Sequence, residues 1–438
     1  MNLNTLKHVR HQVYQCAERS ADALFELCDA LSSESTARSL PELSLSPFFR
    51  RHWPSVYEAL EDGQIDEQRW ATVWTNALVE EHDAPVWISI DSTSIARPEA
   101  ETSSDRGMIY VPNLPHATKP VSVGWQFSSV MLLPEQPSSW GGILSQRRIS
   151  TAETAVSVGI EQLERVRPLL PTSARLLADR WYATGPFVQA CQRLHLGALI
   201  RLKRNRKLYR AAPPHPPGKR GAPRKDGELF QGNRPETWGE PDATWQGSDW
   251  RGKPLVVQGW KRVHFRQARD VEVMVVRVLR EQASGSKRDP RESWFIWVGE
   301  EELPLSEVAA SYRRRFSHEH SYRFLKQDLL WTKVHVRTPE QFERWSLVVA
   351  SAMNQLVLAR VLGQAAYRPW ERRRERVTPR QVRRVMADVL SQVGTPAQVP
   401  KPRGKSPGRQ FGATVTRAAR SAVVRKPKPE PKTARKSA

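Results

Sequence analysis

Val86-Trp87-Ile88-Ser89-Ile90-Asp91 is the stretch from which the fold of this chain can be predicted. Its apolar residues predict a buried β-strand, and the strand ends in a carboxylate. A second run, Arg175-Leu176-Leu177-Ala178-Asp179, predicts another strand that ends in an aspartate. Because functional groups collect at the carboxyl ends of the strands in an α/β sheet, we expect Asp91 and Asp179 to converge at one edge.

Strands and helices alternate around these two runs, as the spacing of apolar residues indicates. The other predicted strands cover 121–133, 198–202, 255–265, 271–279 and 294–298, and the predicted helices cover 151–166, 187–194, 304–330 and 339–362. Strands that alternate with helices are typical of an α/β sheet with parallel strands. The run of strands that begins at residue 255 interrupts this alternation and predicts a β-rich insertion within the α/β core.

We divide the chain into five segments on this basis. They are an N-terminal helical domain (1–82), the first part of the α/β core (83–203), the β-rich insertion (204–291), the second part of the core (292–365) and a basic C-terminal region (366–438). Residues 401–438 contain twelve Lys or Arg and one Glu, a composition that predicts partial disorder.

The charge of the chain points to a polyanionic partner. Its 438 residues include 68 Lys or Arg and 46 Asp or Glu, which gives a formal net charge of +22. On a folded chain with 16 Trp, this charge favours nucleic acid as the partner. The three cysteines match no zinc or disulfide spacing, and no apolar stretch reaches the roughly 20 residues that span a bilayer. The N-terminus lacks the apolar segment of a secretory signal, so we expect a cytoplasmic protein without a membrane span.

A third acidic residue lies in the run Ser311-Tyr312-Arg313-Arg314-Arg315-Phe316-Ser317-His318-Glu319-His320-Ser321-Tyr322-Arg323-Phe324-Leu325-Lys326. In a helix with about 100° per residue, Arg315 lies about −60°, Glu319 about −20° and Lys326 about −40° from Tyr312. One stripe of the helix therefore carries a phenol, a guanidinium, a carboxylate and an ammonium group. A carboxylate flanked by cations suits a site that holds a metal ion and a phosphodiester together.

Each of these signals has a less specific interpretation. An aspartate after a strand can be a turn or helix-cap residue, and a charged helix stripe can be a solvated face with i,i+4 ion pairs. The run His318-Glu319-His320 also suggests zinc. We exclude a zinc site there because residues two apart on a helix point about 200° apart and cannot bind one ion.

The spacing Tyr312-x2-Arg315-x3-Glu319-x6-Lys326 resembles the YREK signature of DDE transposases of the insertion-sequence-four family, a bacterial group. The order of the three acids and the β-rich insertion between the second and the third are also similar. The resemblance covers about residues 84–335, and the basic C-terminal region is similar to that of the insertion-sequence-701 subgroup. One departure follows Asp179, where the family often has Gly or Ala and this chain has Arg180-Trp181-Tyr182.

The resemblance implies a ribonuclease-H-like α/β core and a role for each residue of the pattern. Asp91, Asp179 and Glu319 would be catalytic and would hold two divalent ions, Mg²⁺ or Mn²⁺. The remaining residues are assigned to DNA binding: Arg315 and Lys326 on phosphates, Tyr312 as a hydrogen-bond donor, and Trp294 where some relatives stack a tryptophan on a base. Trp294 also fits a packed strand, Trp294-Phe295-Ile296-Trp297, in which its ring is buried.

The function that these expectations favour is transposition. A DDE transposase binds the terminal inverted repeats of its own element, cleaves them and joins the 3′ ends to target DNA. By the same resemblance we expect a homodimer in the synaptic complex and a place in the bacterial cytoplasm, associated with the nucleoid. Two alternatives stay open: an inactive or domesticated transposase that only binds DNA, and a structure-specific or RNA-directed nuclease of similar fold.

Overall fold

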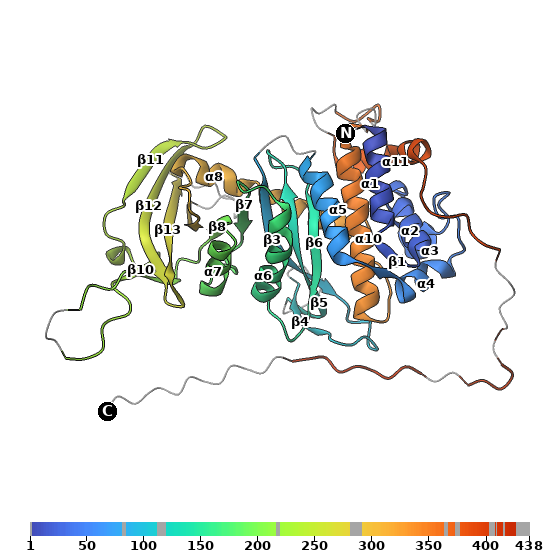
Figure 1. The fold of residues 1–438 in the computed structure, drawn as a ribbon, viewed down its shortest axis with the longest axis horizontal. Coiled ribbons are helices and arrows are strands. Elements are labelled where there is room, and N and C mark those ends of the chain that lie inside the picture. The colour runs from blue at the N-terminus through green and yellow to red at the C-terminus, as the bar shows by residue number, and fades with distance from the viewer. Residues whose placement is uncertain are drawn as a thin grey trace.

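The computed structural model describes residues 2–80, 85–111, 120–215, 220–280, 291–362, 367–372, 377–402, 408, 410–414 and 417–425. In these ranges the chain forms a mixed α/β structure, with one large mixed sheet flanked by helices (Figure 1). No helix of these ranges is both long and apolar enough to cross a membrane. The expected boundary at residue 82 and much of the basic tail lie outside the described residues.

The centre of the sheet has the strand order β6-β5-β3-β7-β8. These strands are β3 (Trp87–Ala96), β5 (Val121–Leu133), β6 (Gly142–Ile149), β7 (Arg175–Ala178) and β8 (Gly197–Arg201). Strand β3 pairs antiparallel with β5 and parallel with β7, which in turn is parallel to β8. Helix α6 (Ala155–Val166) connects β6 to β7, and α7 (Gly185–Arg193) connects β7 to β8. This mixed order is consistent with the expected ribonuclease-H-like fold.

The strands between β8 and the second part of the core extend the same sheet. They are β9 (Lys207–Arg210), β10 (Leu229–Gln231), β11 (Ala243–Ser248), β12 (Pro254–Phe265) and β13 (Ala268–Arg280). Strand β14 (Glu292–Val298) pairs antiparallel with β13 on one side and with β8 on the other. Together with β4 (Gly107–Tyr110), which pairs with β5, they complete a 12-stranded sheet. The predicted strands at 255–265, 271–279 and 294–298 are confirmed.

A layer of helices covers the β6 side of the sheet (Figure 1). The helices are α1 (Leu3–Tyr14), α2 (Ala21–Ser33), α3 (Leu40–Leu43), α4 (Pro54–Asp62), α5 (Glu67–Glu80), α10 (Pro339–Leu358) and α11 (Pro379–Val393). A short ribbon of β1 (Ala17–Arg19) and β2 (Gln64–Ile65) joins the N-terminal helices. Helix α10 contacts both α2 and β6, so it lies between the N-terminal helices and the sheet.

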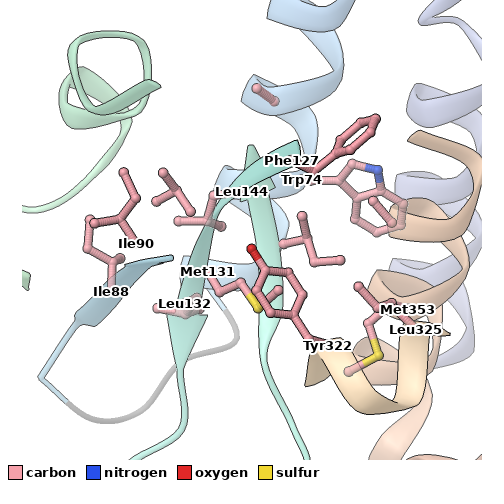
Figure 2. Packing of buried hydrophobic residues seen from close by; sticks show 14 of the residues in the cluster. Trp74, Ile88, Ile90, Phe127, Met131, Leu132, Leu144, Tyr322, Leu325 and Met353 are labelled. Carbon is pink, nitrogen blue, oxygen red and sulfur yellow. The ribbon is translucent and has the colours of Figure 1, made fainter. Parts of the chain in front are cut away.

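One buried cluster runs from the N-terminal helices through α10 to the sheet. Figure 2 shows part of it, with Phe127 and Met131 of β5 beside Trp74, Tyr322 and Met353. Apolar surface of the N-terminal helices is thus buried against the core. A second buried cluster includes Trp87 and Leu177 of the sheet and Val308.

Two features of the C-terminal region were not predicted from the sequence. Helix α11 is one, although Thr378 and Gln381 form a capping box at its start. The other is that residues 417–425 of the tail lie along the core. Val424 N–H donates to the Arg106 oxygen over 2.8 Å, and Val424 forms a parallel bridge with Gly107. Residues 403–407, 409, 415–416 and 426–438 of the tail lie outside the described residues.

Candidate active site

Asp91 and Asp179 lie next to each other at the carboxyl end of the parallel pair β3–β7. The last paired residues of this ladder are Ile90 and Ala178, so each aspartate follows directly. The expectation that β3 ends at Asp91 is wrong, because its pairing with β5 continues to Ala96. Beyond Ile90, β3 continues to pair with β5 but no longer pairs with β7. Asp91 and Asp179 lie at the point where the pairing of β3 with β7 ends.

Side chains along β3 alternate between the two faces of the sheet, and this alternation determines the face to which Asp91 points. Trp87, Ser89 and Asp91 are two residues apart and therefore point to one face of the sheet. This face is covered by α8 (Leu305–Arg313) and α9 (Phe316–Gln327), since Val308 packs with Trp87 and the ring of His318 contacts Ser89. The third acid of the sequence pattern is thereby brought to the same face as the first.

The expected single helix over 304–330 is broken into α8 and α9. Around the break, the N–H groups of Arg315 and His318 donate to the carbonyl oxygens of Tyr312 and Arg315, three residues earlier. Such i→i+3 bonds tighten the backbone relative to an α-helix. Tyr312 and Arg315 remain neighbours across the break, with the Arg315 guanidinium 5.9 Å from the centroid of the Tyr312 ring. Tyr312 lies over β7, with its hydroxyl 3.5 Å from the Ala178 oxygen.

Besides the contacts of Lys326 with Thr93 and Ser94, two hydrogen bonds hold α9 against β3. The Tyr322 hydroxyl donates to the backbone oxygen of Asp91 over 2.8 Å, and Nδ1 of His318 lies 2.7 Å from Oγ of Ser89. Sequence reasoning did not find Tyr322, His318 or Ser89 as positioning residues. A signal was present, because Ser89 shares a strand face with Asp91 and Tyr322 lies one helical turn after Glu319.

Arg315 lies between two of the three acids. Its Nη1 is 2.7 Å from Oδ2 of Asp91, and its Nη2 is 2.6 Å from Oε1 of Glu319. The guanidinium also interacts electrostatically with Asp179. The structure therefore gathers Asp91, Asp179 and Glu319 around one cationic side chain.

Lys326 extends the cationic side of the site along β3. Its Nζ donates to Oγ1 of Thr93 over 2.6 Å and to the Ser94 oxygen over 2.9 Å. Burial lowers the pKa of Lys326 to about 8, and the charge of Asp91 opposes this shift. Burial likewise raises the pKa of Tyr312 to about 12, so its hydroxyl remains a proton donor at neutral pH.

The charge balance of the site depends on Arg315. Burial raises the pKa of Asp91, Arg315 opposes the shift, and the like charge of Asp179 adds to it. Burial also disfavours the charge on Arg315, but the surrounding negative groups, Asp91 and Glu319 among them, outweigh this cost and raise its pKa. A neighbouring cation therefore favours the ionised form of Asp91.

The acids fit divalent cations by their chemistry, because carboxylate oxygens are the ligands that Mg²⁺ and Mn²⁺ prefer. Their placement differs from the expectation that the three carboxylates alone converge. Among the described residues, no group of three His, Cys, Asp or Glu side chains lies close enough to hold a metal ion. The guanidinium of Arg315 supplies positive charge between Asp91 and Glu319 instead.

Trp294 lies in the interior of the extended sheet and not at the carboxylates. Its side chain is 2% exposed, and its ring stacks on Trp260 at 5.8 Å between centroids. Phe230 and Trp238 complete this aromatic group. The packed-strand interpretation of Trp294 therefore describes its surroundings, since a ring that stacks on a base must be exposed. Trp181, two residues after Asp179 in the sequence, is exposed, and the Lys203 ammonium lies 3.6 Å from the centroid of its ring.

Comparison with known families gives one match. Residues 12–261 match the family described as DDE superfamily endonuclease. The matched region contains Asp91 and Asp179 and ends before Glu319, and it begins earlier than residue 84, where we expected the resemblance to begin. The match points to no particular subgroup. No curated protein matches the chain.

Proposed function

Because the chain belongs to the DDE superfamily endonucleases, whose substrate is DNA, we propose that it is a transposase of the insertion-sequence-four family. It would cleave the ends of its own mobile element and join the freed 3′ ends to target DNA. The observation that carries the proposal is the gathering of Asp91, Asp179 and Glu319 around Arg315 at the end of a parallel strand pair. The insertion-sequence-701 subgroup is the finer assignment that the basic C-terminal region favours.

Asp91, Asp179 and Glu319 are the residues that would hold two divalent ions. When bound, Mg²⁺ or Mn²⁺ ions activate water or a 3′-hydroxyl and stabilise the leaving oxygen of a phosphodiester. The protein positions the acids through rigid elements: β3 and β7 hold the two aspartates, and the Tyr322 hydrogen bond holds α9 against β3.

The three remaining residues of the pattern would bind the DNA backbone. A guanidinium forms the same paired hydrogen bonds with phosphate as with carboxylate, so Arg315 can exchange its carboxylates for a phosphate. Lys326 lies on the same helix and adds a second charge that neutralises phosphate. Tyr312, protonated at neutral pH, can donate a hydrogen bond to a phosphate oxygen. Since two element ends must be held together, we also propose a homodimer.

A plasmid that carries the coding region with its native flanking DNA tests the proposal. With Mg²⁺, the wild-type protein should release a linear element and insert it into a second plasmid. Asp91→Asn should abolish both steps, while Asp388→Asn, which changes an exposed aspartate on α11, should leave them intact. Retention of DNA without nicking by the wild type would instead indicate a DNA-binding protein, and nicking without insertion would indicate a nuclease.

A further inference from the structure

A cavity of about 700 Å³ lies on the side of α9 that faces away from the sheet strands of the site. Its walls come from α9, from the connection between α2 and α3, and from the start of α11 with the segment before it. Seven arginines line the cavity against two carboxylates, Asp328 and Glu371. The cavity therefore carries a large excess of positive charge, and it contains none of the three acids described above.

Both carboxylates of the cavity form hydrogen bonds with arginines of its lining. Arg380 forms paired hydrogen bonds with Asp328 at 2.7 and 2.8 Å, and Arg384 does the same with Glu371 at 2.8 and 2.7 Å. Arg383, which is 3% exposed, donates to backbone oxygens, including that of Leu31 over 3.0 Å. These contacts build a rigid wall, so the cavity keeps its shape without a ligand.

Other arginines of the cavity keep their charge available. Arg38, Arg323 and Arg372 are exposed, and none of them forms a salt bridge with a carboxylate of the described residues. Positive charges outnumber negative ones in the cavity and repel one another, so an anion that enters the cavity relieves this repulsion. Guanidinium groups match phosphate oxygens in paired hydrogen bonds, which makes phosphate the anion they suit best.

Helix α9 connects the cavity to the candidate active site. Arg323 follows Glu319 by four residues, which places it about 40° around the helix and about 6 Å along it. His320 and Phe324, on the next face, line the cavity. A chain of phosphates that leaves the three acids along α9 therefore reaches Arg323 first and then the interior of the cavity.

We propose that this cavity binds the phosphodiester backbone of the DNA duplex next to the cleaved bond. The inference rests on the proposed function, because it assigns the same DNA a second contact. The lining offers charge and hydroxyl groups, from Ser35 and Thr378 among others, and its one Phe, Tyr or Trp ring, that of Phe324, is buried. The cavity therefore binds phosphates and not bases. Its contribution to the affinity for DNA is independent of the DNA sequence and sensitive to the salt concentration.

Binding without cleavage tests this inference on the full-length protein. The affinity for a fluorescent 40-bp duplex is measured by anisotropy in EDTA over a series of salt concentrations. The double variant Arg38→Gln/Arg372→Gln should reduce the slope of log affinity against log salt by about 2, because each lost phosphate contact removes about 0.9. Arg323→Gln should reduce it by about 1. The matched control, Arg19→Gln/Arg165→Gln, removes two exposed arginines on β1 and α6 and should leave the slope unchanged.

Two duplexes distinguish the source of the DNA. One carries the DNA that flanks the coding region, and the other has an unrelated sequence. A loss confined to the flanking duplex assigns the cavity to the element end, and an equal loss on both assigns it to any DNA, target included. Unchanged slopes for folded cavity variants on both duplexes would overturn the inference, even if the protein cleaves DNA. A reduced slope without cleavage in Mg²⁺ would leave the inference standing and would refute the proposed function.

Discussion

Tyr322 offers a stringent test of how the site is held together, because its hydroxyl is one of the groups that join α9 to β3. Its oxygen donates to the backbone oxygen of Asp91 over 2.8 Å, and its side chain is 7% exposed. Burial raises the pKa of Tyr322 well above its ordinary value, so the hydroxyl remains a donor throughout the neutral range. A Tyr322→Phe substitution keeps the ring, which stacks on Trp331, and removes the hydroxyl that makes this hydrogen bond.

The expected cost follows from the burial of the acceptor. A buried oxygen that loses its donor costs about 1–3 kcal/mol, so Tyr322→Phe should lower the free energy of unfolding by about that amount. Urea denaturation measures the change. Tyr57→Phe is the matched control, because its partly buried ring packs edge-on against Trp53 and its hydroxyl makes no hydrogen bond to a described residue. The control should change stability by less than about 0.5 kcal/mol.

The same substitution should separate cleavage from binding. Tyr322 fixes the helix that carries Glu319 relative to Asp91, so the cleavage rate in Mg²⁺ should fall, while the affinity for DNA in EDTA should not change. Equal stability of Tyr322→Phe and the wild type, together with an unchanged cleavage rate, would refute this account of how the acids are positioned.

Three further predictions use other contacts of the structure. Arg315→Gln should lower the melting temperature of the metal-free protein, because Asp91 and Glu319 lose their cation. Added Mg²⁺ should then raise the melting temperature of the variant by more than that of the wild type. An equal rise for both proteins would contradict the role of Arg315. The pKa of Lys326 is lowered to about 8, so its charge is present below that pH and lost above it. The affinity for DNA should therefore fall as pH rises through 8, and Lys326→Arg should make the affinity less dependent on pH. The same pH dependence in the variant and the wild type would refute the role of Lys326 in phosphate binding. Trp294→Ala should cost about 3–5 kcal/mol of unfolding free energy, since the side chain is buried, whereas the exposed Trp181→Ala should cost under about 1 kcal/mol in urea denaturation; similar costs would contradict the burial.

Local sequence patterns were sufficient to predict much of the sheet. The runs before Asp91 and Asp179 are strands because their apolar residues are buried on both faces, and their parallel register places the aspartates side by side. The length of β3 was not predictable from its apolar run, because Ser92, Thr93 and Ser94 continue the strand with polar side chains. Pairing with β5 supplies the hydrogen bonds that keep this polar segment extended.

The site depended on tertiary contacts that a helical projection does not contain. The projection placed Tyr312 and Arg315 on one stripe, and the Arg315 guanidinium lies 5.9 Å from the centroid of the Tyr312 ring. It could not show the break between α8 and α9 or the contact of Tyr312 with β7. It also could not show that Arg315 pairs with Asp91, which is 224 residues away. Helix α11 is a different case, since its capping box from Thr378 to Gln381 was readable in the sequence.

The central claim is that Asp91, Asp179 and Glu319 act together in holding divalent cations. Calorimetric titration of the metal-free protein with Mn²⁺ tests it without any assumption about the DNA. The account predicts measurable binding by the wild type and by the control Asp388→Asn, and at least a tenfold loss, about 1.4 kcal/mol, for each of Asp91→Asn, Asp179→Asn and Glu319→Gln. Wild-type affinity in all three variants would contradict it.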